Sequence, residues 1–282
     1  MAAGSHPKGW TEMGEHWDLP TPMRTDIAHS ARIYDYFIGG KDNFRADREA
    51  AEQVLLLRPS LALAAQANRR FMTRAVRFAA SQGLKQFIDI GTGIPTSPNT
   101  HEIAQSVDPE ARIVYVDNDP MVLVHARALL VSAPEGRTAY IDADMRKPST
   151  ILEDSTLRQI LDLDQPVCLM LVAVLHFVAD AEDPYGLIAK LLNACPSGSM
   201  LILSHGTEDH SDEAGARALS AYRASGVNLH LRPHAEVLRF FDGLTLAEPG
   251  LQLVNQWRPD NDIDRAARPQ DITWYGAVAT KP

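Results

Sequence analysis

The segment of the chain most suited to chemistry is Phe87–Gly93, which reads FIDIGTG and runs from a predicted strand into a turn and a helix. Glycine has no Cβ, so Gly91 and Gly93 would let the backbone approach a ligand closely. A nicotinamide or flavin site requires another glycine three positions after the second, but position 96 is Thr. Asp89 would disfavour a pyrophosphate and attract an ammonium or sulfonium ligand. Alone, the motif also fits an ordinary tight turn.

Two further carboxylates follow the next two predicted strands. Asp117 lies 24 residues after Gly93, near the ~20 expected for an acid that binds ribose hydroxyls. Asp144 precedes Met145, and there a carboxylate can accept from an adenine amino group while the thioether packs on the ring. Each acid alone could be a solvated loop residue or a helix cap. Acids at three successive strand ends beside a glycine turn predict a ligand crevice at the carboxyl edge of an open sheet.

Alternating strands and helices from Lys85 onward position these residues. The predicted strands cover 86–90, 113–116, 138–141, 167–174 and 200–203, and the intervening helices cover 99–107, 120–132 and 183–195. This alternation predicts right-handed crossovers and a mostly parallel sheet with helices on both faces. After helices near 212–223 and 233–241, two strands at 251–257 and 272–279 are joined by a polar loop without a helix. They predict an antiparallel pair at one edge.

The chain before this region has a different pattern. Residues 1–25 are polar, rich in Gly and Pro and without a period, which predicts a loose arm. Residues 26–83 show helical periodicity and no strand pattern. Asp47 is a plausible N-cap for a helix over 48–57, and an apolar stripe that begins at Phe71 indicates a helix ending at Gly83.

Composition excludes several classes of protein. The 282 residues carry 27 Lys and Arg against 36 Asp and Glu, a formal charge of −9, which disfavours nucleic-acid binding and a basic membrane-surface module. Two cysteines cannot form a disulfide framework, which favours a reducing compartment. The first twenty residues do not resemble a signal peptide, and the most apolar run, 167–179, is too short to span a membrane. We therefore expect a cytoplasmic protein of enzyme size.

From Lys85 to the C-terminus the sequence resembles the class I S-adenosylmethionine-dependent methyltransferases. The segment 31–44, ARIYDYFIGGKDNF, with Asp47-Arg48 after it, is similar to the opening signature of an actinobacterial methyltransferase family of undefined substrate. The segments NRRF at 68–71 and DIGTGIPT at 89–96 are similar to the same family. Pro95 departs from the broad class, where a third glycine often stands, and would stiffen the turn.

The resemblance implies a Rossmann-like, doubly wound α/β fold with a seven-stranded sheet, formed by 84–282, and a helical lid over 26–83. It implies S-adenosylmethionine as the cofactor. The implied cofactor-binding residues lie at the strand ends and are Asp89, Gly91, Thr92, Gly93, Asp117, Asn118, Asp144, Met145, Ala173 and Val174. The lid candidates for contact with cofactor or substrate are Tyr34, Tyr36, Gly40, Asn43 and Arg69. Core packing or a solvated face is the alternative for each lid residue.

His176 and His205 follow the fourth and fifth predicted strands, so either could face the crevice as a general base. Alternatively, either imidazole could cap a strand end through a backbone carbonyl. Val174–Phe177 lacks the Asn- or Asp-Pro-Pro-aromatic turn of enzymes that methylate exocyclic amines of bases, and no metal-ligand spacing is present. The expected acceptor is a small molecule or a protein side chain, with no nucleic acid, membrane or metal involved.

Three functions fit these observations: a methyltransferase for a small-molecule acceptor, a non-catalytic S-adenosylmethionine-binding regulator, and a nicotinamide-dependent oxidoreductase. Thr96 and Asp89 disfavour the last. The identity of the acceptor, the atom methylated and the oligomeric state are not predicted by the sequence.

Overall fold

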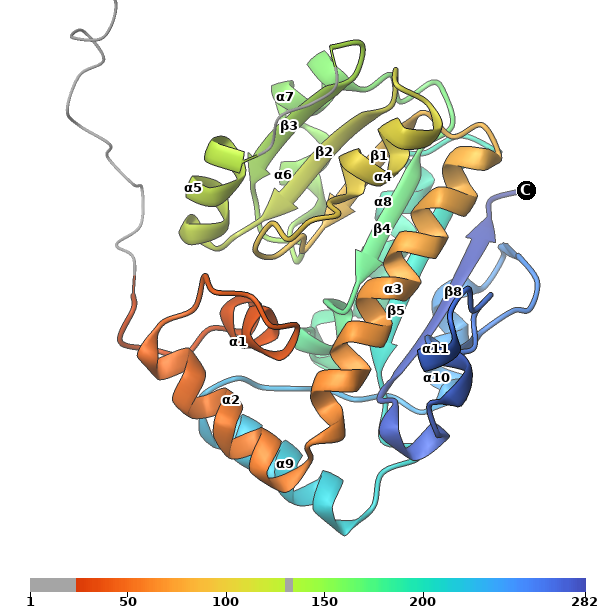
Figure 1. The fold of residues 1–282 in the computed structure, drawn as a ribbon. Coiled ribbons are helices and arrows are strands. Elements are labelled where there is room, and N and C mark those ends of the chain that lie inside the picture. Colours follow the sequence, from red (N-terminus) through yellow and green to blue (C-terminus); the bar gives the residue numbers. More distant parts are fainter. Residues whose placement is uncertain (1–23, 130–133) are drawn as a thin grey trace, which may run out of the picture.

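The computed structural model describes residues 24–129 and 134–282. Nearly all of the predicted arm, residues 1–23, lies outside this range. Within it, eight strands form one sheet in the order β3-β2-β1-β4-β5-β8-β6, and β7 also pairs with β8 (Figure 1). The strands are β1 (Gln86–Ile90), β2 (Arg112–Asp117), β3 (Arg137–Asp142), β4 (Cys168–Val172), β5 (Met200–Gly206), β6 (Thr245–Leu246), β7 (Gln252–Leu253) and β8 (Trp274–Thr280).

The first five strands are parallel, and β8 is antiparallel to β5, β6 and β7. Every residue of β1 and β5 is buried, because both strands are central and covered on both faces. All five parallel strands place their carboxyl ends along the same edge, where β1 leads directly into the glycine turn at Gly91. The predicted mixed, mostly parallel sheet is therefore confirmed.

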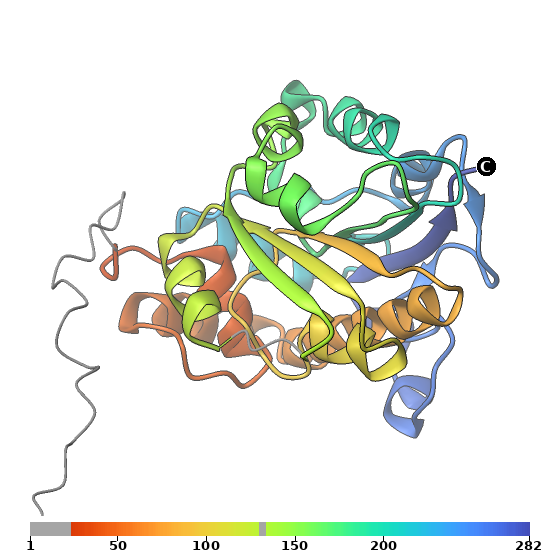
Figure 2. The ribbon, with the colours of Figure 1, turned by 90° about the horizontal axis from the view of Figure 1, so that it is seen from above.

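Helices cover both faces of the sheet, as Figure 2 shows from above. On one face lie α3 (Ser60–Ser81) and α4 (Thr100–Val107), and on the other α6 (Pro148–Leu152) and α8 (Pro184–Asn193). The remaining helices of this region are α5 (Pro120–Leu129) and α7 (Ser155–Ile160). The short α6 and α7 are not predicted by the sequence, because neither is long enough to show a helical period.

A group of helices faces the carboxyl edge of the sheet. It consists of α1 (Ser30–Phe37), α2 (Arg45–Leu57) and α9 (Glu213–Ala224), which the sequence separates widely. Figure 1 shows α2 and α9 side by side below the sheet, and residue contacts join them. Asp47 is not the N-cap of α2 but its third residue, and its carboxylate accepts from the Phe44 and His29 amides, each at 2.8 Å.

The C-terminal strands differ from the prediction in number and length. The expected seven-stranded sheet has eight strands, because one edge position is divided between β6 and β7, which pair with different ends of β8. Strand β5 runs three residues past its predicted end, to Gly206. The loop after the predicted strand 251–257 also contains α11 (Asp262–Ala266), and α10 (His234–Leu238) is shorter than predicted.

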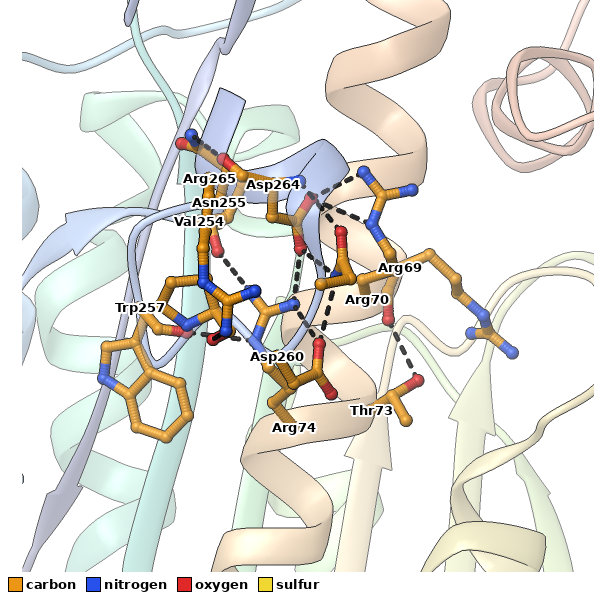
Figure 3. Close-up of polar contacts among 12 residues, drawn as sticks. Arg69, Arg70, Thr73, Arg74, Val254, Asn255, Trp257, Asp260, Asp264 and Arg265 are labelled. Atoms are coloured by element: carbon orange, nitrogen blue, oxygen red, sulfur yellow. Dashed lines mark hydrogen bonds and ion pairs between the residues drawn. The ribbon is translucent and has the colours of Figure 1, made fainter. Parts of the chain in front are cut away.

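A buried cluster of ion pairs connects α11 to α3. Asp264 is fully buried and pairs with Arg70 and Arg74, with N–O distances of 2.6 Å in both cases. Arg74 also donates to the carbonyl of Val254 at 2.7 Å. Figure 3 shows both arginines directed toward Asp264, whereas the neighbouring Arg69 points away from the cluster. The neighbouring residues Arg69 and Arg70 of α3 thus point to different sides of the helix.

Candidate active site

A cavity of about 480 Å³ lies at the carboxyl edge of the parallel strands, between the glycine turn and the helices α1 and α9. Its lining combines strand-end residues with residues of the N-terminal helices. The sequence-predicted site residues that line it are Asp89, Gly91, Thr92, Gly93, Asp117, Asn118, Asp144, Met145, Ala173, Val174, Tyr34, Arg69 and His176. Tyr36, Gly40, Asn43 and His205 are not part of the lining.

The two positions of the turn, Gly91 and Gly93, are occupied by glycine for different structural reasons. Both have positive φ, +72° at Gly91 and +66° at Gly93, which glycine adopts without a steric penalty. A Cβ on Gly91 would lie 2.3 Å from Cγ2 of Val174, so the packing of the protein itself requires glycine there. A Cβ on Gly93 would have Ala31 Cβ, at 4.0 Å, as its nearest neighbour. Gly93 therefore borders open space between the turn and α1.

Asp89 is a buried carboxylate at the end of β1. One of its oxygens accepts from the Thr100 hydroxyl at 2.6 Å. Burial raises the pKa of Asp89 to about 6, against the opposing effects of the Thr100 hydrogen bond and the Arg69 charge. A bound cation beside this carboxylate would favour its charged form. The residue fits a positively charged ligand group.

Asp117 organises the turn from the neighbouring strand. Its two oxygens accept from the amides of Gly93, at 2.8 Å, and Asp119, at 3.0 Å. Burial raises the pKa of the Asp117 carboxyl above its ordinary value. A carboxylate has about four lone-pair sites, so these two bonds leave acceptor capacity for the hydroxyls of a ligand.

Asp119 connects this strand end to the N-terminal helices. Its carboxylate pairs with His29 at 3.0 Å and with Arg32 at 3.5 Å. Arg32 is itself buried and pairs with Asp47 at 2.8 Å. Two buried carboxylates and one buried guanidinium thus hold the start of α1 against the end of β2.

The third predicted strand end is more open. Asp144 is half-buried, and its carboxylate accepts from the Arg146 amide at 2.9 Å. Met145 is buried and lines the cavity beside it, whereas Asn118 is exposed. The arrangement leaves one oxygen of Asp144 for a ligand and sets a thioether next to it.

Ala173, after β4, has an unusual backbone conformation for an alanine, with φ +54°. Such a left-handed conformation costs about 1–2 kcal/mol for a residue with a Cβ. The Ala173 amide compensates by donating to both the carbonyl, at 3.1 Å, and the hydroxyl, at 3.0 Å, of Ser204. Strain that neighbouring structure maintains at a cavity wall is typical of functional sites.

The predicted lid residues divide between the cavity and the interior of the helical region. Tyr34 and Arg69 line the cavity. Tyr36 instead donates to Glu52 at the surface, at 3.0 Å. Asn43 donates to the buried Asp35 carboxylate at 2.8 Å, and a Cβ on Gly40 would overlap that same carboxylate. Gly40 and Asn43 therefore shape the loop around Asp35 rather than the cavity.

Arg69 lies beside the glycine turn, and the Asp89 carboxylate is close enough to interact with its charge. It donates to the carbonyls of Thr96 and Pro98. Its buried Nε has no hydrogen-bond partner among residues 24–129 and 134–282. A guanidinium with an unused donor next to a carboxylate fits a zwitterionic ligand group.

The two histidines have different surroundings. His205 lies within β5 because that strand is longer than predicted, and both its ring nitrogens are engaged, with Gly206 O at 2.7 Å and Arg232 at 2.8 Å. His176 lines the cavity, and its Nδ1 accepts from the Gly206 amide at 3.3 Å. Burial lowers the pKa of His205 to about 3 and that of His176 well below its ordinary value. One ring nitrogen of each imidazole accepts a hydrogen bond, which fits the neutral form.

Sequence reasoning missed the residues that close the far side of the cavity, chiefly Asn68, Tyr222 and Trp274. Trp274 could have been found from topology, because the first residue of an antiparallel strand lies at the carboxyl edge of its parallel neighbour. The register pairs it with Gly206 at the end of β5. The sequence gives no comparable signal for Tyr222, because its position at the cavity depends on how α9 packs against α2.

Over the described part of the chain, no group of three or more His, Cys, Asp or Glu side chains could hold a metal ion. The helices of that part include none with the length and apolar character needed to cross a membrane.

Comparison with known proteins gives consistent results. A family model described as S-adenosyl methyltransferase matches residues 17–282. A DUF574 family protein from Streptomyces avermitilis has 51% sequence identity and a TM-score of 0.90, with 93% of this chain and 100% of that chain covered. A proposed methyltransferase from Thermobifida fusca has 36% identity and a TM-score of 0.82, covering 90% and 95% of the two chains. None of the curated proteins matches.

Proposed function

The chain belongs to the S-adenosyl methyltransferase family and is an S-adenosylmethionine-dependent methyltransferase, and we propose that it methylates a small molecule enclosed beneath its N-terminal helices. The observation that carries this proposal is that the lining of one cavity joins the strand-end carboxylates to residues of α1, α3 and α9. Membership in this family disfavours the alternative function of a nicotinamide-dependent oxidoreductase.

The methionine end of the cofactor would lie between Asp89 and Arg69. It carries an ammonium and a carboxylate, which match a buried carboxylate and a guanidinium with an unpaired Nε. Gly93 supports this placement, because its missing Cβ leaves room for close approach.

The adenosine would extend along the strand ends. Asp117 would accept from the ribose hydroxyls with the lone pairs that the Gly93 and Asp119 amides leave free, and Asn118 would border the ribose. Asp144 would accept from the adenine amino group, while Met145 packs against the ring. Ala173 and Val174 would form the wall beside the glycine turn, because Val174 packs on Gly91.

Residues 26–83 would act as a lid over the domain formed by 84–282. The buried pairs of Asp119 with His29 and Arg32 support this, because they attach the start of α1 to the strand end that bears Asp117. Tyr34 would close the cavity from α1. A closed lid excludes water from the reacting groups, which is one of the main requirements of methyl transfer.

When bound, S-adenosylmethionine supplies a methyl group on a cationic sulfur. The protein's part would be to align the methyl acceptor and keep the site dry. His176 would take part as a neutral hydrogen-bond donor, because its Nδ1 already accepts from Gly206 and its proton is then on Nε2. His205 would support β5 and Arg232 instead of contacting the substrate.

The proposal can be tested with S-adenosylmethionine labelled in its methyl group. The enzyme is incubated separately with the small-molecule and macromolecular fractions of a cell extract, with Asp117→Ala as a control expected to lose cofactor binding. Label should enter the small-molecule fraction with the wild-type enzyme only. Transfer confined to protein or nucleic acid would refute the small-molecule acceptor.

A further inference from the structure

One wall of the cavity contains buried polar groups that the cofactor contacts described above do not use. Asn68 Oδ1, Thr273 Oγ1 and Trp274 Nε1 belong to residues that line the cavity. None of these atoms has a hydrogen-bond partner within the described residues. Asn68 is fully buried and Trp274 is 7% exposed. Buried polar groups in native proteins are nearly always paired, so several unpaired ones at one cavity indicate a ligand that pairs them.

The orientation of the Asn68 amide follows from its neighbour. The Tyr34 hydroxyl has one proton, which it donates to the carbonyl of Ala65 at 3.1 Å. Asn68 must therefore be the donor in its 2.9 Å contact with that hydroxyl, through Nδ2. The amide oxygen is consequently the free atom. Asn68 offers an acceptor to a ligand, whereas the indole N–H of Trp274 offers only a donor.

Tyr34 connects Asn68 with Trp274 in the lining of the cavity. Tyr34, which bonds to Asn68, meets Trp274 edge-on with ring centroids 6.3 Å apart. The ring of His176 lies 6.4 Å from that of Trp274. The Nδ1 atom of His176 accepts from the Gly206 amide, so Nε2 carries the proton and is a second donor on this wall.

The rest of this half of the cavity is apolar, with a lining that includes Phe37, Ile38, Leu61, Ala218, Tyr222 and Leu231. Two of its charged side chains are hydrogen-bonded to neutral groups of the protein, and a third faces water. Arg58 donates to the Ser211 hydroxyl at 3.2 Å, and Asp35 accepts from Asn43 at 2.8 Å. Glu208 is exposed. A charged ligand group placed among these apolar residues would lose its hydration, which is strongly unfavourable.

Building on the proposed function, we propose that the methyl acceptor is a neutral, flat aromatic molecule whose hydroxyl group donates to Asn68 Oδ1 and accepts from Trp274 Nε1. A phenol-type hydroxyl has one proton and free lone pairs, which match the acceptor and the donor on this wall. Its ring would fill the apolar half of the cavity against Phe37 and Tyr222, as aromatic rings pack against one another in cores.

The experiment uses the full chain saturated with S-adenosylhomocysteine and three probes that share one ring system: 2-naphthol, naphthalene and 2-naphthoate. Saturation-transfer NMR titrations measure the affinity of each. We expect 2-naphthol to bind at least about threefold and up to about a hundredfold more tightly than naphthalene, the range that one or two net hydrogen bonds supply. We expect 2-naphthoate to bind more weakly than either.

Two matched substitutions test whether the indole N–H of Trp274 binds the hydroxyl of the probe. Trp274→Phe removes the indole N–H and keeps an aromatic ring, and it should reduce the preference for 2-naphthol over naphthalene, because only the bond to Asn68 then remains. Trp257→Phe makes the same chemical change at another buried tryptophan whose Nε1 also lacks a partner within the described residues, but which does not line the cavity. The control should keep the preference. Thermal unfolding and S-adenosylhomocysteine affinity show that each variant is folded.

Several results would overturn this inference: equal affinity for 2-naphthol and naphthalene, tighter binding of 2-naphthoate, no saturable binding of any probe, or equal effects of the two tryptophan substitutions. Its failure is distinguishable from failure of the cofactor site. A wild-type protein that does not bind S-adenosylhomocysteine contradicts the proposed function itself. One that binds it but shows no preference among the probes contradicts only the phenol-type acceptor.

Discussion

The two glycines of the turn provide a matched pair of substitutions with different expected outcomes. Gly91→Ala and Gly93→Ala each place a Cβ at a left-handed position, which costs about 1–2 kcal/mol. Only the Cβ at Gly91 overlaps Val174, at 2.3 Å, and overpacking of this kind adds about 1–3 kcal/mol. We therefore expect Gly93→Ala to lower the melting temperature by about 2–8 °C and Gly91→Ala by clearly more.

Cofactor affinity should show a different order from stability. Since the Cβ of Gly93→Ala would enter the space beside Ala31 that we assign to the cofactor, S-adenosylmethionine should bind at least about tenfold more weakly, a loss of about 1.4 kcal/mol. Val174→Ala combined with Gly91→Ala should restore part of the lost stability, because it removes the overlapping methyl groups. Thermal unfolding and calorimetric titration measure both quantities. Unchanged affinity in Gly93→Ala, or equal stability of the two single variants, would refute this reasoning.

Three further predictions concern charge and motion. Burial raises the pKa of Asp89 to about 6, so the contribution of its protonated form to the stability of the unliganded protein is present below about pH 4 and is lost as the pH rises through 6. A bound ammonium favours the charged carboxylate. The affinity for S-adenosylmethionine should therefore fall up to about tenfold per pH unit below 6. Asp89→Asn should remove that slope in calorimetry, and a slope retained by the variant would contradict the assignment. Asp264→Ala should destabilise the fold by about 3–5 kcal/mol in denaturant titrations, because it leaves Arg74 buried without its carboxylate; a change under about 1 kcal/mol would show that the cluster contributes little. S-adenosylhomocysteine should slow amide hydrogen exchange in α1, which supplies cavity residues such as Tyr34, and an unchanged exchange rate would argue against a lid.

The parts of the fold that the sequence predicts well are those with a strong local pattern. Strand β1 and the turn after it lie where the apolar run and the glycines place them, and the strand-end acids Asp89, Asp117 and Asp144 all line one cavity. Parallel topology accounts for this, because it brings successive carboxyl ends to a common edge.

Tertiary packing decides what the local pattern leaves open. His205 was a candidate base only if β5 ended before it, but pairing with β8 extends that strand through Gly206 and buries the imidazole in the sheet. Similarly, Tyr34 and Tyr36 are residues of the same type in the same helix, α1, yet Tyr34 lines the cavity and Tyr36 reaches the surface. The side that each one faces depends on how α1 packs, which its own sequence does not specify.

A crystal structure of the protein with S-adenosylhomocysteine tests the central claim most directly. We predict that the ligand lies in the cavity at the carboxyl edge, with its ribose hydroxyls within hydrogen-bond distance of Asp117 and its sulfur facing the wall formed by Tyr34, Asn68 and Trp274. A ligand bound outside this cavity, or one whose sulfur faces away from that wall, would contradict the account.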